Sequence, residues 1–415
     1  MQTQLAPEFR DTAEGREAEA ILRKCVHCGF CTATCPTYQL LGDELDGPRG
    51  RIYLIKQVLE GEMPTEKTRT HLDRCLTCRN CETTCPSGVQ YGHLVDIGRR
   101  IVEQKVPRSA AQKALRWTLK EGLTSPLFGP AMKLGQSVRG MLPKALQAKV
   151  PQPQPAGAWP TRVHPRRMLL LAGCVQPAMA PNINAATARV LDACGIQTLV
   201  VSQAGCCGAV RFHLNDQAGG LRQMRTAIDA WWPLLDSGQA EAIVVNASGC
   251  GVTVKDYGHL LRDDPAYAAK AERVSAAARD LGELLPDLLP RLRECVVPPP
   301  AGEVLAYHPP CTLQHGQKLR GGVETALRTL GFDLRTAPEE SHLCCGSAGT
   351  YSVLQPALAQ PLRDRKLQHL GKLRPKAILS ANIGCITHLQ SGTPTPVRHW
   401  IEALDEALPP PVTPA

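Results

Sequence analysis

The sequence has few aromatic residues and no long apolar segment. Phe, Trp and Tyr make up 4% of its 415 residues. The Lys and Arg residues behind the net charge of +9 are dispersed rather than interleaved with Phe or Tyr, which argues against nucleic-acid binding. The richest apolar stretch, 168–173, is far shorter than the roughly 18 residues of a membrane span. With no G-x-G-x-x-G motif after a predicted strand and no P-loop, the chain has no evident nucleotide site of its own.

The N-terminus also lacks the apolar segment of a secretory signal, because residues 1–23 mix Glu, Asp and Arg. The 18 cysteines would suit a secreted disulfide scaffold, but the chain is long for that class. We therefore expect reduced, metal-bound thiols in the cytoplasm. At 43% hydrophobic residues, the chain has enough apolar material for two or three domains.

Eight cysteines form two runs of one pattern, C-x2-C-x2-C-x3-C-P. This is the bacterial ferredoxin spacing for [4Fe-4S] clusters, in which three thiolates of a run hold one cluster and the fourth reaches the other. C-x2-C pairs also occur in zinc sites, but zinc requires neither the third cysteine nor Cys-Pro. We therefore predict two clusters. The first is ligated by Cys25, Cys28, Cys31 and Cys85, and the second by Cys75, Cys78, Cys81 and Cys35.

The connection between the runs is longer than in a minimal two-cluster ferredoxin. Apolar positions within 52–59 lie on one helical face, which predicts an inserted helix and hence a helical ferredoxin domain. Arg49 and Arg51 precede this helix. They could compensate cluster or partner charge, but we expect a solvated turn at the helix start.

Residues 106–150 are basic and amphipathic. Apolar residues such as Leu115, Trp117 and Leu127 alternate with basic ones. A helix pair lying on a membrane or partner surface would have this pattern, although two packed helices with solvated outer faces would too. The basic residues are Lys113, Arg116, Lys120, Lys133, Arg139, Lys144 and Lys149. A Pro-rich linker follows at 151–166.

The rest of the chain contains an internal repeat of short apolar strands and helices, which predicts a parallel α/β layer in each half. We expect strands at 167–171, 198–201, 242–245, 303–308 and 376–379, and helices near 184–194 and 323–330. Cysteines recur at similar spacings where strands end. They are Cys174, Cys206, Cys207 and Cys250 in the first half, and Cys311, Cys344, Cys345 and Cys385 in the second.

Thiols at strand ends, beside helix N-termini, favour a metal or redox role for this repeat over inert packing. Cys194 and Cys295 lie outside it and are expected to be core or surface residues. Because the cysteines already suffice as ligands, the nearby histidines are expected to pack or to form hydrogen bonds. These are His27, His308, His342 and His388.

The paired runs followed by two Cys-Cys-Gly units resemble the iron-sulfur subunit of bacterial glycolate oxidase. The stretches 25–53, 204–209 and 342–351 carry the resemblance. The C-terminal half is also similar to the cysteine-rich domains of heterodisulfide reductase, to lactate-utilisation proteins and to the anaerobic glycerol-3-phosphate dehydrogenase small subunit. The heterodisulfide reductase pattern has a C-x2-C pair where this chain has only Cys250 or Cys385, which leaves metal binding by the repeat open.

The resemblance implies a membrane-peripheral complex on the cytoplasmic side of the bacterial inner membrane. In it, FAD-containing flavoprotein subunits oxidise glycolate to glyoxylate, and this chain relays electrons to a quinone or other acceptor. We expect the chain to be inactive alone. The alternatives are a lactate or glycerol-3-phosphate dehydrogenase subunit, a catalytic repeat that reduces a disulfide or quinone, and a zinc-bearing nucleic-acid module.

The expected fold class is α plus α/β, a helical two-cluster ferredoxin domain followed by a pseudo-duplicated α/β cysteine-rich domain. We place the ferredoxin domain at 1–105, the basic helices at 106–150 and the linker at 151–166. The two Cys-Cys-Gly domains are placed at 167–297 and 303–408.

Overall fold

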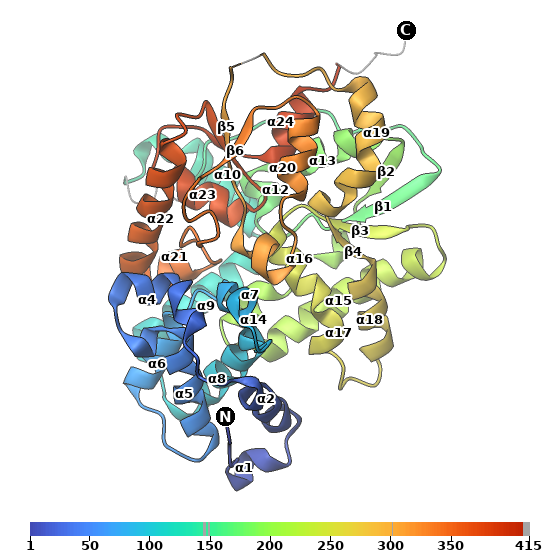
Figure 1. Ribbon diagram of the computed structural model, residues 1–415. Coiled ribbons are helices and arrows are strands. Elements are labelled where there is room, and N and C mark those ends of the chain that lie inside the picture. Colours follow the sequence, from blue (N-terminus) through green and yellow to red (C-terminus); the bar gives the residue numbers. More distant parts are fainter. Residues whose placement is uncertain (144–146, 148–149, 301, 410–415) are drawn as a thin grey trace.

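The computed structural model describes residues 1–143, 147, 150–300 and 302–409 (Figure 1). Helices make up its N-terminal part, and two small parallel sheets with their covering helices make up the rest. This arrangement confirms the predicted fold class. Lys144 and Lys149 of the basic segment lie outside the described residues.

The N-terminal region is entirely helical in its regular structure and contains both cysteine runs. The inserted helix predicted between the runs is α5, which buries Ile52, Ile55, Val58 and Leu59 against α8. The helices are α1 (Pro7–Arg10), α2 (Ala13–Lys24), α3 (Phe30–Ala33), α4 (Pro36–Leu41), η1 (Glu44–Asp46), α5 (Pro48–Leu59), α6 (Glu66–Asp73), α7 (Asn80–Thr84) and α8 (Tyr91–Lys105).

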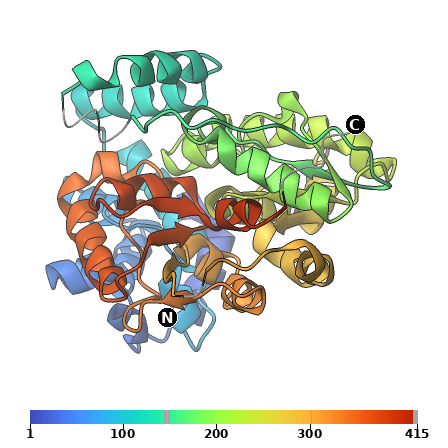
Figure 2. The same ribbon diagram turned by 90° about the horizontal axis from the view of Figure 1, so that it is seen from above.

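A pair of helices, α9 (Ala110–Thr124) and α10 (Phe128–Ser137), follows and is completed by the short η2 (Arg139–Met141). All residues of α9 and α10 are described, and none of them is buried. The pair projects from the edge of the molecule in Figure 2. The segment is thus helical, as predicted, but its apolar side chains are not packed into a core.

Each of the two cysteine-rich units has its own four-stranded sheet, and the two sheets have the same topology. The strand orders are β2-β1-β3-β4 and β6-β5-β7-β8, and all neighbouring strands are parallel. The strands are β1 (Arg166–Leu170), β2 (Ile196–Leu199), β3 (Ala242–Val245), β4 (Ala278–Asp280), β5 (Leu305–His308), β6 (Leu334–Thr336), β7 (Ala377–Ser380) and β8 (Val397–His399). The predicted strand 198–201 begins two residues earlier than expected, and β4, β6 and β8 were not predicted.

Helices cover both sheets, as parallel sheets require (Figure 1). The helices of the first unit are α12 (Gln176–Met179), α13 (Pro181–Ala193), η3 (Ser202–Ala204), α14 (Ala209–His213), α15 (Gln217–Asp236), α16 (Ser248–Lys255), α17 (Tyr257–Leu260), α18 (Ala268–Ala277), η4 (Leu281–Leu284) and α19 (Leu285–Cys295). Those of the second unit are η5 (Thr312–Gly316), α20 (Gly322–Thr329), α21 (Tyr351–Leu354), α22 (Pro356–Gly371), α23 (Ile383–Gln390) and α24 (Trp400–Glu406).

The two units pack through a shared hydrophobic core. Helix α13 of the first unit lies against α24 of the second, and Val190, Leu191, Trp400 and Leu404 belong to one buried cluster. Within this interface, the fully buried His399 imidazole pairs through Nε2 with the Asn246 carbonyl at 2.9 Å. The two units therefore share one hydrophobic core.

The helical N-terminal region contacts the first unit through a charged interface. Glu17 of α2 accepts hydrogen bonds from Arg262 at 2.6 Å and from His259 at 3.1 Å. Nearby, Arg79 donates to Asp256 at 2.8 Å. Burial alone would raise the pKa of Glu17, but the hydrogen bonds from His259 and Arg262 outweigh it and lower this pKa to about 2.

Glu17→Gln should destabilise the interface in a pH-dependent way. The pKa of Glu17 is lower in the folded chain than the ordinary 4.5, so its stabilisation is fully present above about pH 4.5. It is lost as the pH falls toward 2. We expect a loss of about 1.5–3 kcal/mol at pH 7, the range for hydrogen bonds to charged groups, and a smaller loss at pH 4. Thermal unfolding at both pH values measures it.

Glu19→Gln is the matched control, because Glu19 lies on the same helix and pairs only with the exposed Arg23 among the described residues. Its effect should stay under about 1 kcal/mol. An equal loss in the two variants would contradict this account of the interface.

Candidate metal centres

Each cysteine run is a tight loop with the same backbone irregularity. His27 and Gly29 in the first run, and Thr77 and Arg79 in the second, have positive φ. Left-handed residues alternating with right-handed ones turn successive N–H groups toward one concave side, the kind of nest that receives anions and iron-sulfur clusters. In the second run, the Thr77 N–H donates to the Cys75 Sγ at 3.4 Å. The repeated left-handed conformation at three non-glycine residues costs free energy, so it indicates a local function.

The first predicted set of cysteines comes together around one cavity. Cys25, Cys28 and Cys31 line it from their own run, and Cys85 lines it from the other. Cys81 also reaches this cavity. Burial raises the pKa of the Cys31 thiol to about 11, with further contributions from Cys25, Cys28 and Cys85.

The second predicted set lines a neighbouring cavity, formed by Cys35, Cys75, Cys78 and Cys81. Burial raises the pKa of Cys81 well above its usual value, and Cys78, Cys75 and Cys35 all add to this rise. In both cavities, therefore, the fourth cysteine of one run faces three cysteines of the other. Two sets of four converging thiols fit the thiolate ligation that [4Fe-4S] clusters need.

Two buried arginines surround the second set. Arg51 is 1% exposed. Arg99 donates to the Cys75 carbonyl at 2.6 Å. Burial would raise the pKa of the Cys75 thiol, but the positive charges of Arg51 and Arg99 outweigh it and lower this pKa. The Tyr91 hydroxyl donates to the Cys75 Sγ at 3.6 Å. The expectation of a solvated turn is therefore wrong for Arg51, whose guanidinium is turned into the core beside the cysteines.

Arg51 is held by a buried network. It contacts Asp46 at 3.4 Å and donates to the Thr37 hydroxyl at 3.1 Å. Asp46, which is fully buried, also contacts Arg74 at 2.8 Å and His71 at 3.1 Å. Arg49, by contrast, pairs with Glu44 at the surface, which agrees with the solvated turn expected there. The sequence could not separate the two arginines, because only the phase of α5 decides which of them points inward.

The four cysteines of the first cysteine-rich unit also come together. Hydrogen bonds link the thiols of Cys174, Cys206, Cys207 and Cys250 in that order, and those from Cys174 and Cys207 lower the pKa of Cys206. The Tyr257 hydroxyl donates to the Cys207 carbonyl at 2.9 Å. Cys250 lies in the first turn of α16 rather than directly at a strand end.

The second unit repeats this chain of thiols, from Cys311 through Cys344 and Cys345 to Cys385. The Sγ atoms of Cys311 and Cys344 are 3.7 Å apart. This set adjoins the second cysteine run, since Leu76, Cys311 and Cys344 share one buried cluster against which Cys78 packs. Cys194 and Cys295 are half-buried and pack against the shared core, as expected.

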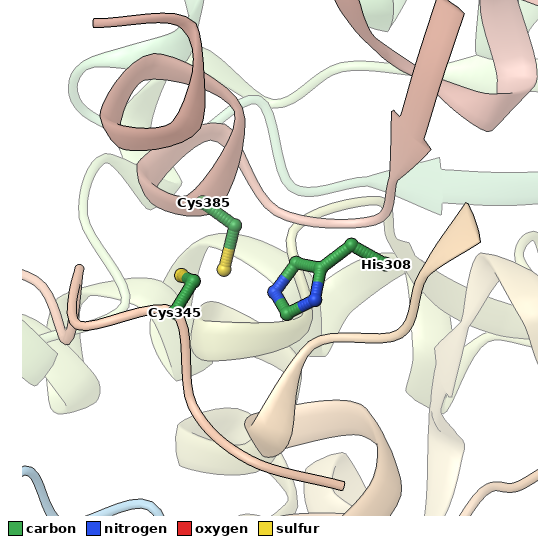
Figure 3. Close-up of side chains that lie close together, drawn as sticks. All are labelled: His308, Cys345 and Cys385. Atoms are coloured by element: carbon green, nitrogen blue, oxygen red, sulfur yellow. The ribbon is translucent and has the colours of Figure 1, made fainter. Parts of the chain in front are cut away.

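His308 adds an imidazole to the second set. Its ring lies beside the sulfur atoms of Cys345 and Cys385 (Figure 3), and the ligand atoms of all three residues lie within 4.8 Å of one another. No hydrogen-bond partner for either ring nitrogen exists in the described part of the chain. His308 is thus buried by packing alone, one of the two roles expected for it. The His388 Nε2, by contrast, pairs with the Ala359 carbonyl at 3.1 Å, as expected.

Sequence reasoning missed the second run's contacts with the second unit. Thr83 pairs with His315 at 3.1 Å, Asn80 donates to the His342 carbonyl at 3.4 Å, and Tyr351 donates to the Arg74 carbonyl at 3.0 Å. These polar residues stand next to the cysteine motifs in the sequence. That proximity was the available signal.

Comparison with known proteins agrees with this geometry. Residues 21–89 match the 4Fe-4S dicluster domain, and 168–255 and 305–390 match the cysteine-rich domain. The chain is 56% identical to the glycolate oxidase iron-sulfur subunit of Escherichia coli, over 98% of this chain and 99% of that protein. It is 28% identical to the probable glycolate oxidase iron-sulfur subunit of Bacillus subtilis, over 94% of this chain and 92% of that protein. Lactate utilization protein A of Geobacillus thermodenitrificans is 26% identical, over 58% of this chain and 98% of that protein.

Asp46→Asn should destabilise the N-terminal region, because it leaves the buried Arg51 without its anionic partner. Removing one member of a buried ion pair costs about 3–5 kcal/mol, and we expect a loss near the lower end because Asn still accepts hydrogen bonds. Glu44→Gln breaks only the surface pair with Arg49 and should cost under about 1 kcal/mol. Thermal unfolding and iron retention compare the two variants; equal effects would mean that Arg51 is not held as described.

Proposed function

Because the chain belongs to the family of glycolate oxidase iron-sulfur subunits, we propose that it is the electron-transfer subunit of a complex that oxidises glycolate to glyoxylate. The observation that carries this proposal is the convergence of two four-cysteine sets in adjacent cavities of one helical region. Substrate oxidation moves two electrons, whereas iron-sulfur clusters pass single electrons when bound. A flavin on a partner protein would accept the two electrons together and pass them to the clusters one at a time.

The proposed ligands are Cys25, Cys28, Cys31 and Cys85 for one [4Fe-4S] cluster, and Cys75, Cys78, Cys81 and Cys35 for the other. Around the second set, Arg51, Arg99 and the Tyr91 hydroxyl favour the negative charge of a reduced site. Such charges and donors are the protein's means of raising a reduction potential. Arg49, the arginine that lines the cavity of the first set, is half-exposed and pairs with Glu44, so the second site should have the higher potential.

The exposure of the two sets supports an order of electron flow. Cys28 is exposed, and the neighbouring Val26 and Phe30 are 68% and 60% exposed. An exposed apolar patch beside the first set suits docking of a flavoprotein that carries FAD. The second set is enclosed by the second cysteine-rich unit. Electrons would enter at the first set and pass to the second, and from there toward a quinone or other acceptor.

A peripheral contact with the cytoplasmic face of the inner membrane is proposed for α9 and α10. Trp117, Leu127 and Leu134 are 62%, 73% and 67% exposed on these helices and the turn between them. Lys113 and Lys133 belong to the same two helices. Basic residues near anionic lipid each contribute roughly 1 kcal/mol. Within the described residues, the structure has no helix that is long and apolar enough to cross a bilayer.

For the domains, we keep the boundaries expected from the sequence, namely 1–105, 106–150, 151–166, 167–297 and 303–408. The charged interface around Glu17 and the shared core of the two cysteine-rich units support docked rather than tethered domains.

Affinity purification of the tagged chain from its native host should capture a flavoprotein. Membranes are collected at low salt, and the tagged chain is then released from them at high salt. The proteins captured with it are identified and assayed for FAD and for glycolate-dependent dye reduction. We expect FAD and activity in the complex and neither in the chain alone. The absence of any flavoprotein from preparations that retain their iron would contradict the proposal.

Variants Cys85→Ser and Cys35→Ser test the crossed ligation. The first should damage the cluster of Cys25, Cys28 and Cys31, and the second that of Cys75, Cys78 and Cys81. Each should lose about four of the eight irons that two cubanes contain. Low-temperature electron spin resonance should show a different signal lost in each variant.

Cys295→Ser serves as the control, because Cys295 lies outside all cysteine sets and should leave both signals intact. If Cys85→Ser instead damaged the cluster of Cys75, Cys78 and Cys81, and Cys35→Ser that of Cys25, Cys28 and Cys31, the runs would not be crossed.

A further inference from the structure

Arg79 lies within the second cysteine run in a backbone conformation that favours glycine. It stands between Cys78 and Cys81, with a φ of 57° and a ψ of 13°, at the N-cap of α7. The equivalent position of the first run is Gly29, which has a φ of 86°. A left-handed conformation strains a residue that has a Cβ, whereas glycine adopts it freely. The second run therefore carries an arginine where the first run uses glycine.

The Arg79 side chain connects the second cysteine set with the first cysteine-rich unit. Arg79 is among the residues that line the cavity of the second set. Its guanidinium donates to Asp256 at 2.8 Å, although the two residues lie 177 positions apart in the sequence. The side chains of this ion pair are only 14% and 25% exposed, so solvent screens it weakly. Asp256 directly follows α16, whose first turn carries Cys250.

Gly92 provides the space for this contact. A Cβ at Gly92 would lie 2.6 Å from the Arg79 Nε and 3.0 Å from the Glu82 Oε1. The Gly92 N–H itself donates to the Glu82 Oε1 at 2.5 Å. The absence of a side chain at Gly92 thus lets the arginine pass along the first turn of α8 toward the first unit.

Carboxylates from three elements face the Arg79 guanidinium. Burial would lower the pKa of Arg79, but Asp256, Glu82 of α7 and Asp96 of α8 outweigh it and raise this pKa. Burial would likewise raise the pKa of Asp256, but contacts with His93 and Arg79 lower it to about 2. The His93 Nε2 is 3.9 Å from the Asp256 carboxylate. Arg79 is therefore a cation beside the second set, and its charge is compensated across the interface.

We propose, on the basis of the proposed function, that Arg79 is a positioning residue for the second cluster and that Asp256 of the first cysteine-rich unit holds it in place. The ion pair keeps the loop between Cys78 and Cys81 in its left-handed conformation. The cation favours the reduced form of a cluster bound there. Docking of the first unit is thereby coupled to how firmly the second cluster is retained and to its reduction potential.

Arg79→Gly and Arg79→Ala separate the effect of the charge from that of the backbone. Both remove the cation, so in the full-length chain with its iron both should lower the reduction potential of the second cluster. Only alanine keeps a Cβ at the left-handed position without the ion pair that holds it. Arg79→Ala should therefore lose this cluster to a chelator roughly 5- to 30-fold faster than Arg79→Gly, the factor that corresponds to a cost of about 1–2 kcal/mol for a left-handed residue with a Cβ.

Asp256→Asn should act in the opposite direction on the potential. It leaves the charge of Arg79 uncompensated, so the reduction potential of the second cluster should rise. Iron loss should also become faster, and this effect should vanish in the Arg79→Gly background, because glycine needs no partner to adopt the conformation. Redox titration followed by electron spin resonance measures the potential, and iron analysis during chelation measures the loss.

Asp264→Asn is the matched control, because it makes the same charge change in the same unit. Asp264 pairs with Arg225 at 2.7 Å, and its loss should change neither readout. Since Arg79→Gly relieves strain, the test does not depend on the folding of the other variants. An unchanged potential in both Arg79 variants, or equal iron retention in them, would overturn the proposal. An unmodified chain without a signal from the second cluster would contradict the proposed function itself, and the role of Arg79 with it.

Discussion

The guanidinium of Arg51 connects four helices of the N-terminal region while it is 1% exposed to solvent. It extends from α5 to Thr37 of α4, to Asp46 of η1 and to the carbonyl of His71 in α6. A buried cation is stable only when it is paired and hydrogen-bonded. The loops that carry Cys35 and Cys75 are fixed between these helices. The geometry of the second cysteine set therefore depends on keeping this charge compensated.

That buried charge also serves the chemistry proposed for the region. Burial and, after it, repulsion from the neighbouring Cys78 and Cys75 raise the pKa of the Cys81 thiol. Arg51 and Arg99 oppose this effect at Cys75 and lower its pKa. The first set has Arg49 beside it, but this arginine pairs with Glu44 at the surface, where solvent screens its charge. Two sets with one sequence pattern thus acquire different electrostatic environments.

The two cysteine-rich units show how a repeated fold acquires different roles. Both have the same strand order and a chain of four thiols at the same edge of the sheet. Within the described part of the chain, the second unit alone packs its thiols against the second cysteine run, and there His308, without a hydrogen-bond partner, takes the place of Leu171. The first unit instead contacts the N-terminal region through ion pairs, such as that of Arg79 with Asp256.

Spacing and apolar periodicity are local properties, so they sufficed to predict the cysteine sets, the inserted helix α5, the repeat and most of its central strands. The sequence did not reveal β4, β6 and β8, each only three residues long, since such strands are defined by pairing rather than by pattern. Tertiary structure alone decided which arginine is buried, which unit adjoins the second run and that His308 faces two thiols. These features depend on distances between residues far apart in the chain, which the packing of helices and sheets sets.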